Sequence, residues 1–252
     1  MKRILLIASV ILFVNTLNSQ NSINASEIIR SIKEGKHISY KNTTIVGDLD
    51  FTFMKDLLQN LPTKKRSFWK SNTSNTLEKK IKVAVFFENC TFKNNVFAYI
   101  HDEDSSYTFV ANFEENLVFK NCIFKETALF KYSKFRKNAD FSGCKFFGDT
   151  TFKYANFIKD ISFINTSFIK ESTFKYTKFN KNVSFANSIF KESATFKYTK
   201  FKAGVTFKNS RFEEDLDFKY TQIHGSFNIT GMYVAYNMDT KYATINGDKF
   251  NY

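Results

Sequence analysis

Phenylalanine recurs along most of this chain at steps that alternate between five and six residues. Two series with a strict period of eleven carry the pattern. The first series is Phe113, Phe124, Phe135, Phe146, Phe157, Phe168, Phe179, Phe190, Phe201, Phe212 and Ile223, and the second is Phe119, Phe130, Phe141, Phe152, Phe163, Phe174, Phe185, Phe196, Phe207, Phe218 and Ile229. A step of five rotates a residue by about 140° around a helix and moves it to the opposite face of a straight strand. The pattern therefore predicts a chain that turns at every repeat.

The residues two positions before each Phe predict how large one complete coil is. Before the first series they are all small: Ala111, Cys122, Ser133, Cys144, Ala155, Thr166, Thr177, Ser188, Thr199, Ser210 and Thr221. Before the second series, bulkier residues alternate with smaller ones, so that the full pattern repeats every 22 residues. We therefore expect four short faces per coil, each with one large and one small inward residue. Stacking such coils at about 4.8 Å gives parallel sheets around an axis filled by Phe.

Polar residues between the faces indicate where the chain turns. The extra residue of the six-residue step is often of a type that suits a left-handed or bulged corner, as in Asn138, Asp149, Asp160, Asn182, Gly204 and Asp215. An outward position on another face forms a column that predicts a ladder of side-chain amides, namely Asn121, Gly143, Asn165, Asn187 and Asn209.

The motif small-x-Phe-x-x, seen here as "SKF", "ANF", "TSF" and "TKF", resembles the pentapeptide-repeat family in its Phe-rich form. The resemblance covers roughly residues 39–230. It implies an all-β fold, a right-handed quadrilateral β-helix, and the handedness comes from the resemblance alone. Some family members resemble DNA and inhibit topoisomerases. That role is not expected here, because this chain is basic and its first residues have the pattern of an export signal.

The first 20 residues have the pattern of a secretory signal peptide. Lys2 and Arg3 precede an apolar run at positions 4–14, which is shorter than a bilayer span requires. A permanent membrane anchor is the weaker alternative. We therefore expect an exported protein, periplasmic or extracellular, with no transmembrane span after signal removal.

The remaining chain divides into a cap, a β-helix and an irregular end. Residues 21–36 predict a capping helix with Ser26 as N-cap, an apolar side at Ile28, Ile29 and Ile32, and Gly35 as its stop. The β-helix is expected over 37–230, with loop insertions at about 54–82 and 98–108. Residues 231–252 predict an irregular coil or cap, or a contact with another subunit, so a homodimer through an end of the helix is compatible with the pattern.

The motif "FKY" returns once per coil and places Lys and Tyr in adjacent outward columns. They are Lys131, Lys153, Lys175, Lys197 and Lys219, followed by Tyr132, Tyr154, Tyr176, Tyr198 and Tyr220, and the sequence predicts no acid on this face across these five coils. With a net charge of +13, the face is a candidate anion-binding surface. The alternative is a solvated strand face whose Tyr rings shield the Lys stems. A second candidate contact is the predicted loop with Lys64, Lys65, Arg66 and Trp69.

Residues that could support catalysis or metal binding are scattered. His37, His101 and His224 have no partner at a recognised spacing, so no catalytic, cofactor-binding or metal-binding residue is assigned and no cofactor is expected. Cys90, Cys122 and Cys144 share one inward column, where they are either small buried fillers or neighbours able to form a disulfide.

These observations favour a non-enzymatic exported scaffold or protein-interaction module. The alternative is a binding module for an anionic envelope polymer or membrane surface. Nucleic acid is not expected as the partner.

Overall fold

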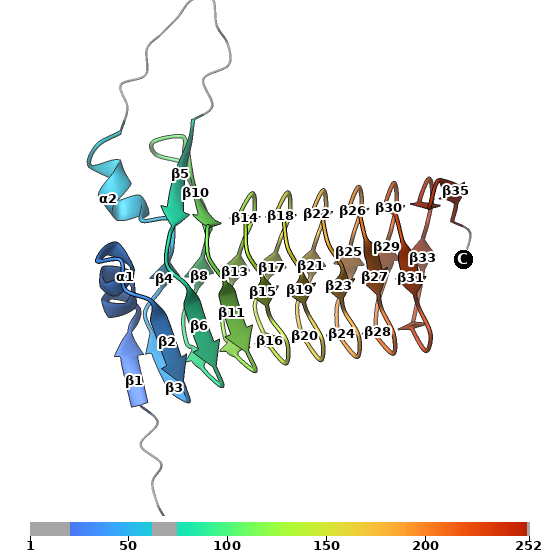
Figure 1. Ribbon diagram of the computed structural model, residues 1–252, viewed down its shortest axis with the longest axis horizontal. Coiled ribbons are helices and arrows are strands. Elements are labelled where there is room, and N and C mark those ends of the chain that lie inside the picture. Colours follow the sequence, from blue (N-terminus) through green and yellow to red (C-terminus); the bar gives the residue numbers. More distant parts are fainter. Residues whose placement is uncertain (1–20, 62–74, 251–252) are drawn as a thin grey trace, which may run out of the picture.

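The structure of the protein, a computed structural model, describes residues 21–61 and 75–250. Figure 1 shows one elongated stack of coils, with helices α1 (Ala25–Lys33) and α2 (Met54–Leu58) at its N-terminal end. Each coil contributes one strand to each of four sheets, in the chain order B, A, C, D. Neither described helix is long and apolar enough to span a bilayer. The predicted signal peptide lies outside the described residues.

The four sheets extend along the whole stack. Sheet B contains β2 (Ile38–Lys41), β6 (Val85–Glu88), β11 (Leu117–Lys120), β15 (Ala139–Asp140), β19 (Ile161–Ser162), β23 (Val183–Ser184), β27 (Gly204–Thr206) and β31 (Ser226–Asn228). Sheet A contains β1 (Asn21–Asn24), β3 (Thr43–Val46), β7 (Thr91–Phe92), β12 (Ile123–Phe124), β16 (Lys145–Phe146), β20 (Ser167–Phe168), β24 (Ile189–Phe190), β28 (Arg211–Phe212) and β32 (Tyr233–Val234).

Sheets C and D complete the quadrilateral. Sheet C contains β4 (Leu49–Asp50), β8 (Val96–Phe97), β13 (Ala128–Leu129), β17 (Thr150–Thr151), β21 (Ser172–Thr173), β25 (Ala194–Thr195), β29 (Leu216–Asp217) and β33 (Met238–Asp239). Sheet D contains β5 (Thr76–Ile81), β10 (Tyr107–Phe113), β14 (Lys134–Phe135), β18 (Asn156–Phe157), β22 (Lys178–Phe179), β26 (Lys200–Phe201), β30 (Gln222–Ile223), β34 (Thr244–Ile245) and β35 (Asp248–Lys249), with β9 (Tyr99–Asp102) beside β10.

Successive coils pair in parallel, one coil apart. Phe135 is in register with Phe157, and Phe157 with Phe179, so the predicted period of 22 residues is the length of one coil. The fold is therefore a right-handed quadrilateral β-helix, as expected.

Phe side chains fill the axis as one column per sheet. Phe152, Phe174 and Phe196 are fully buried, and their ring centres are 5.2 and 4.8 Å apart with nearly parallel planes. Rings of neighbouring columns meet edge to face, as Phe163 and Phe174 do at 5.4 Å. Such offset and edge-to-face contacts add roughly 0.5–1.5 kcal/mol per pair beyond area burial.

The small Ser, Thr and Cys residues two positions before the Phe of the first series form hydrogen bonds to backbone carbonyls of the core. Thr177 Oγ1 donates a hydrogen bond of 2.7 Å to the Phe152 carbonyl, and Ser188 Oγ donates one of 2.7 Å to the Phe163 carbonyl. Cys144 Sγ lies 2.8 Å from the Phe119 carbonyl in the same position. Each of these side chains thus satisfies its own polar group inside the core and ties consecutive coils together.

The three Cys are free and buried, so the structure contains the filler arrangement and not the disulfide. Hydrogen bonding with Cys122, followed by burial, raises the pKa of the Cys90 thiol, and burial is the main cause that raises the pKa of Cys122. Thiols with raised pKa values are poor nucleophiles and poor metal ligands at neutral pH.

The left-handed corners do not lie where residue type suggested. Of Asn138, Asp149, Asp160, Asn182, Gly204 and Asp215, Gly204 alone has a positive φ, at 126°. The left-handed positions are instead the Asn column between sheets B and A and the Tyr column between sheets C and D. The predicted amide ladder is confirmed: Asn187 Nδ2 donates to Asn165 Oδ1 at 3.1 Å, and Asn209 Nδ2 to Asn187 Oδ1 at 3.3 Å. At Gly143 a Cβ would lie 2.0 Å from Asn121 Oδ1, so glycine interrupts the ladder there.

The N-terminal end is covered by β1 and α1. Asn24, and not Ser26, is the N-cap, because its side chain accepts a hydrogen bond of 2.9 Å from the Ser26 backbone N–H. Ile28 and Ile32 are buried against the first coil, Ile29 is partly buried, and Gly35 follows the helix with φ 76°. The N-terminal cap therefore consists of strand β1 in addition to the predicted helix.

Part of each expected loop insertion pairs with the β-helix. Within 54–82, strand β5 extends sheet D through six residue pairs with β10. Within 98–108, β9 folds back antiparallel on β10 as a hairpin. The first insertion also contains α2. The alternating Phe pattern is absent from these segments, which explains why their register could not be predicted.

The coil geometry continues past residue 231 to β34, where β35 folds back antiparallel. The inward residues of this last coil, Phe227, Val234 and Met238, are only partly buried. Phe250 covers part of this end, with its ring centre 5.4 Å from that of Phe227.

Candidate anion-binding ridge

Lys and Tyr of each "FKY" motif form the corner between sheets C and D. We call this corner the Lys/Tyr ridge; it comprises Lys131, Tyr132, Lys153, Tyr154, Lys175, Tyr176, Lys197, Tyr198, Lys219 and Tyr220. Every ridge Tyr has left-handed backbone, with φ between 57° and 64°. At each of these residues the chain passes from a strand of sheet C to a strand of sheet D. The structure thus brings together all ten residues predicted for this face.

The ridge Tyr rings stack on one another along the helix axis. Ring centres of Tyr154, Tyr176 and Tyr198 are separated by 4.6 and 4.7 Å, with interplanar angles of 2° and 1°. The stack extends to Tyr132 at one end, and through Tyr220 to Tyr242 at the other. Because each ring face covers the next, the stack presents ring edges and hydroxyl groups to solvent.

The Lys amines fold over this stack. The Nζ atoms of Lys153, Lys175 and Lys197 lie 5.5, 5.4 and 5.5 Å from the ring centres of the Tyr that follow them. Contacts of this kind are worth about 0.5–1 kcal/mol at exposed sites. They hold the amines beside one another along the ridge.

Hydroxyl groups of sheet C fix the backbone of the ridge. Thr151, Thr173 and Thr195 each accept a hydrogen bond, at 3.2–3.3 Å, from the backbone N–H of the ridge Lys two residues later. Asp217 Oδ1 does the same for the Lys219 backbone N–H at 2.8 Å. The backbone at four successive ridge Lys residues is therefore held by the same type of hydrogen bond in each coil.

Crowding of like charges is visible in the middle of the ridge. Burial, followed by repulsion from Lys131 and Lys175, lowers the pKa of Lys153. Burial and the neighbouring Tyr220 and Tyr176 raise the pKa of Tyr198. A bound anion would relieve the repulsion between the Lys amines, and this favours binding.

The two ends of the ridge differ from its middle. Lys131 Nζ donates to the Tyr99 hydroxyl at 3.1 Å, and Lys219 Nζ forms an ion pair of 2.9 Å with Asp239. The acid that pairs with Lys219 belongs to the next coil, outside the five coils for which a face without acids is expected. Asp239 lies beyond the last "FKY" motif, so the repeat did not reveal it. Within the described residues, Lys153, Lys175 and Lys197 form no ion pair.

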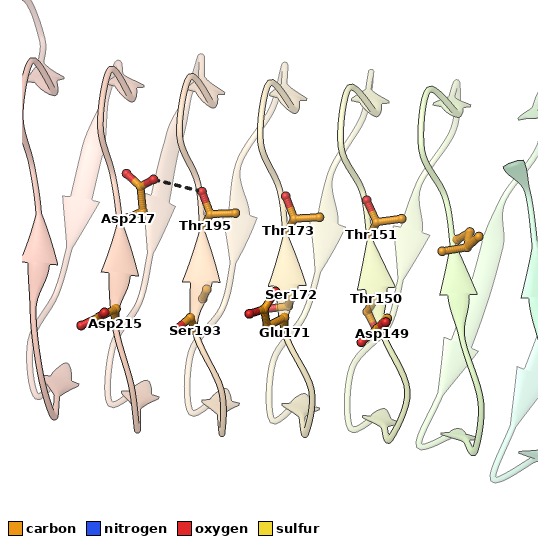
Figure 2. Close-up of a pocket in the computed structure, with 12 residues that line it drawn as sticks. Asp149, Thr150, Thr151, Glu171, Ser172, Thr173, Ser193, Thr195, Asp215 and Asp217 are labelled. Carbon is orange, nitrogen blue, oxygen red and sulfur yellow. Dashed lines mark hydrogen bonds between the residues drawn. The ribbon is translucent and has the colours of Figure 1, made fainter. Parts of the chain in front are cut away.

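An acidic groove runs alongside the ridge on sheet C. Figure 2 shows Asp149, Glu171, Ser193 and Asp215 along one side of it and the supporting Thr residues along the other. The groove has a volume of about 350 Å³, and Asp217 contacts Thr195 Oγ1 at 3.4 Å within it. These carboxylates repel an anion from sheet C. A polyanion on the ridge would extend instead toward Lys178 and Lys200, which are exposed on sheet D.

The other predicted contacts and chemical groups do not join the ridge. Lys64, Lys65, Arg66 and Trp69 lie outside the described residues. His37 Nδ1 accepts from the Ala84 backbone N–H at 3.0 Å, and His101 Nδ1 is 3.0 Å from Thr108 Oγ1 in the hairpin. In the described ranges, no three His, Cys, Asp or Glu residues group as metal ligands.

The sequence matches a family model described as pentapeptide repeats, in nine copies, over residues 111–156, 130–178 and 174–222. A comparison with curated proteins gave no match. Among solved structures, the chain is similar to HetL, a pentapeptide repeat protein involved in heterocyst differentiation regulation from the cyanobacterium Nostoc. The identity is 11%, the alignment covers 90% of this chain and 100% of HetL, and the TM-score is 0.25.

Proposed function

Because the chain belongs to the pentapeptide repeat family, whose members are generally non-enzymatic structural repeat proteins, we propose that it is an exported scaffold and interaction module. The observation that carries this proposal is the continuous Lys/Tyr ridge, in which three Lys on consecutive coils are held over stacked Tyr and form no ion pair with any residue that the structure describes. The ridge binds an anionic polymer of the cell envelope, and no reaction is catalysed.

The ring arrangement favours an anionic glycan over nucleic acid as the ligand. Proteins that bind single-stranded nucleic acid stack bases on exposed aromatic faces. On the ridge, neighbouring Tyr rings cover those faces at 4.6–4.7 Å. What remains is a row of amines and phenol hydroxyls, which suits carboxylate or sulfate groups on a flexible polysaccharide. Such binding is electrostatic and weakens as salt rises.

Two charge-reversal variants in the same coils test the ridge. The ridge variant is Lys153→Glu with Lys175→Glu and Lys197→Glu, and the matched control is Lys159→Glu with Lys181→Glu and Lys202→Glu, three exposed Lys at the corner between sheets D and B. On an immobilised polysulfated glycan with a salt gradient, the wild type and the control should elute at similar salt, whereas the ridge variant should not be retained. Equal loss in both variants would show that net charge alone matters. Stronger retention on single-stranded DNA would overturn the choice of ligand.

Export is supported by the pattern of residues 1–20. We expect the protein recovered outside the cytoplasm to lack these residues, as an intact-mass measurement would report. Full-length protein confined to the cytoplasm would contradict the proposal.

A further inference from the structure

The ridge is bordered on sheet C by one outward residue per coil, two positions before the Lys of that coil. These bordering residues are in register along the stack and are Leu129, Thr151, Thr173, Thr195, Asp217 and Asp239. Figure 2 shows Thr151, Thr173, Thr195 and Asp217 in one row. The border is therefore neutral beside the first four ridge Lys and acidic from the fifth coil onward.

Both carboxylates of the border act on Lys219. Its Nζ atom lies 2.9 Å from Asp239 Oδ2, and its backbone N–H donates to Asp217 Oδ1 at 2.8 Å. Hydrogen bonding and attraction by Asp239, with a smaller contribution from Asp217, raise the pKa of Lys219. Burial, followed by repulsion from neighbouring Lys, lowers the pKa of Lys153. Two Lys of one column thus lie in opposite electrostatic surroundings.

The acidic border continues into the next coil. Lys241 Nζ lies 5.2 Å from the Tyr242 ring centre, and the Lys241 backbone N–H donates to Asp239 Oδ1 at 3.0 Å. An exposed ion pair contributes little and can open, but the carboxylate charges stay in place when it does. Two Lys and two Asp therefore cancel across these coils. An anionic group gains no net attraction there, so the attractive part of the ridge ends at Lys197.

The Lys column also has a defined N-terminal end. Phe97 is in register with Leu129, so Tyr99 takes the place of a Lys one coil before Lys131. The Tyr99 hydroxyl accepts a hydrogen bond of 3.1 Å from Lys131 Nζ. Because this hydroxyl is neutral, Lys131 keeps its charge. From Tyr99 onward the chain forms β9, which pairs with β10 as a hairpin. The column of uncompensated Lys therefore begins at Lys131.

We propose that the ridge is a closed site for four successive carboxylates of a glycan, and that Asp217 and Asp239 set its length. The inference rests on the proposed function, in which the ridge binds an anionic polymer. The cations of the site are Lys131, Lys153, Lys175 and Lys197. They recur at the coil repeat of about 4.8 Å. This repeat is close to the length of one sugar unit in an extended polysaccharide, so the ligand class that fits is a polyuronate, with one carboxylate on every sugar.

Oligogalacturonates of two to eight sugars test the length of the site by isothermal calorimetry at low salt. For the wild type, the association constant should rise at least threefold with each added sugar up to four. Beyond four sugars it should rise only in proportion to the number of registers that a longer chain can occupy on four Lys.

Substitutions in the border should move this limit in both directions. Asp217→Thr with Asp239→Thr introduces the residue of the three preceding coils, whose hydroxyl accepts the equivalent backbone N–H. The steep rise should then extend to six sugars, because Lys219 and Lys241 become available. The opposite change, Thr195→Asp, should end the rise at three sugars. Thermal unfolding of each variant shows whether it is folded.

A matched control separates the border from net charge. Glu27→Gln with Asp160→Asn carries the same change in net charge as the double Thr variant, at exposed positions outside the ridge, and should keep the wild-type dependence on length.

The outcomes distinguish this inference from the proposed function. A wild-type association constant that rises as steeply beyond four sugars as below, or folded border variants with the wild-type limit, would show that the acids do not set the length. Retention of the wild type on the immobilised glycan without the expected limit would overturn this inference alone. Failure of the wild type to bind both the oligomers and the immobilised glycan would overturn the proposed function itself.

Discussion

At the scale of single residues, the Tyr column shows stacking overriding backbone preference. Left-handed backbone costs most non-glycine residues roughly 1–2 kcal/mol, and Asn is among those that tolerate it best. The Asn column obeys this preference. The Tyr column repeats the same conformation with a residue that does not favour it, at φ near 60°. Contacts with the coils above and below must therefore offset the strain, which explains why residue type alone placed the corners incorrectly.

Replacing one internal ridge Tyr tests this balance. Tyr176→Asn relieves backbone strain but removes ring contacts with Tyr154 at 4.6 Å and Tyr198 at 4.7 Å. Each aromatic pair contributes roughly 0.5–1.5 kcal/mol beyond area burial. We expect a net loss of about 1–2 kcal/mol in the free energy of unfolding, measured by denaturant titration.

Two control substitutions show whether the loss of stability depends on the number of ring contacts removed. Tyr242→Asn, at the end of the stack, removes one ring contact in place of two and should cost less. Tyr236→Asn, on a ring that is 76% exposed and outside the stack, should change stability little. A more stable Tyr176→Asn variant would mean that strain outweighs stacking.

At the scale of elements, the repeat predicted strands and register wherever Phe alternates with small residues. Phe87 and Phe92 pair with Phe119 and Phe124, and the β9–β10 hairpin in the predicted insertion at 98–108 lies between these two coils in the chain. The pairing of β5 with β10 was not predictable, because "TLEKKI" carries no repeat signal and its partner strand is set by tertiary contact.

In the ridge too, some features could be predicted from the 22-residue repeat and others could not. Its ten residues followed from the 22-residue period, because one motif per coil gives one column per position. The ring stacking depends on side-chain rotamers, and the pairing of Lys219 with Asp239 depends on a coil whose sequence, "NMDTKYAT", lacks the Phe signal.

At the scale of the whole molecule, the two ends of the stack differ in how the outermost coil is covered. The N-terminal end is covered by β1 and α1. At the other end, β31, β32 and β33 are the last strands of their sheets among the described residues, and β35 pairs only with β34. Unpaired strand edges next to partly buried apolar groups favour association with another chain. We therefore propose that any homodimer of this protein forms through the C-terminal end.

Charge placed at the C-terminal end tests this proposal. Val234→Lys with Met238→Lys introduces repulsion between two copies that meet there, since both residues line the half-covered last coil. Sedimentation of the wild type should show concentration-dependent dimers, and the variant should remain monomeric at the same concentration. The variant should also keep most of its thermal stability, because these positions are already partly exposed and coils form parallel contacts mainly with their immediate neighbours. A wild type that is monomeric up to millimolar concentration, or a folded variant that dimerises equally well, would contradict association through this end.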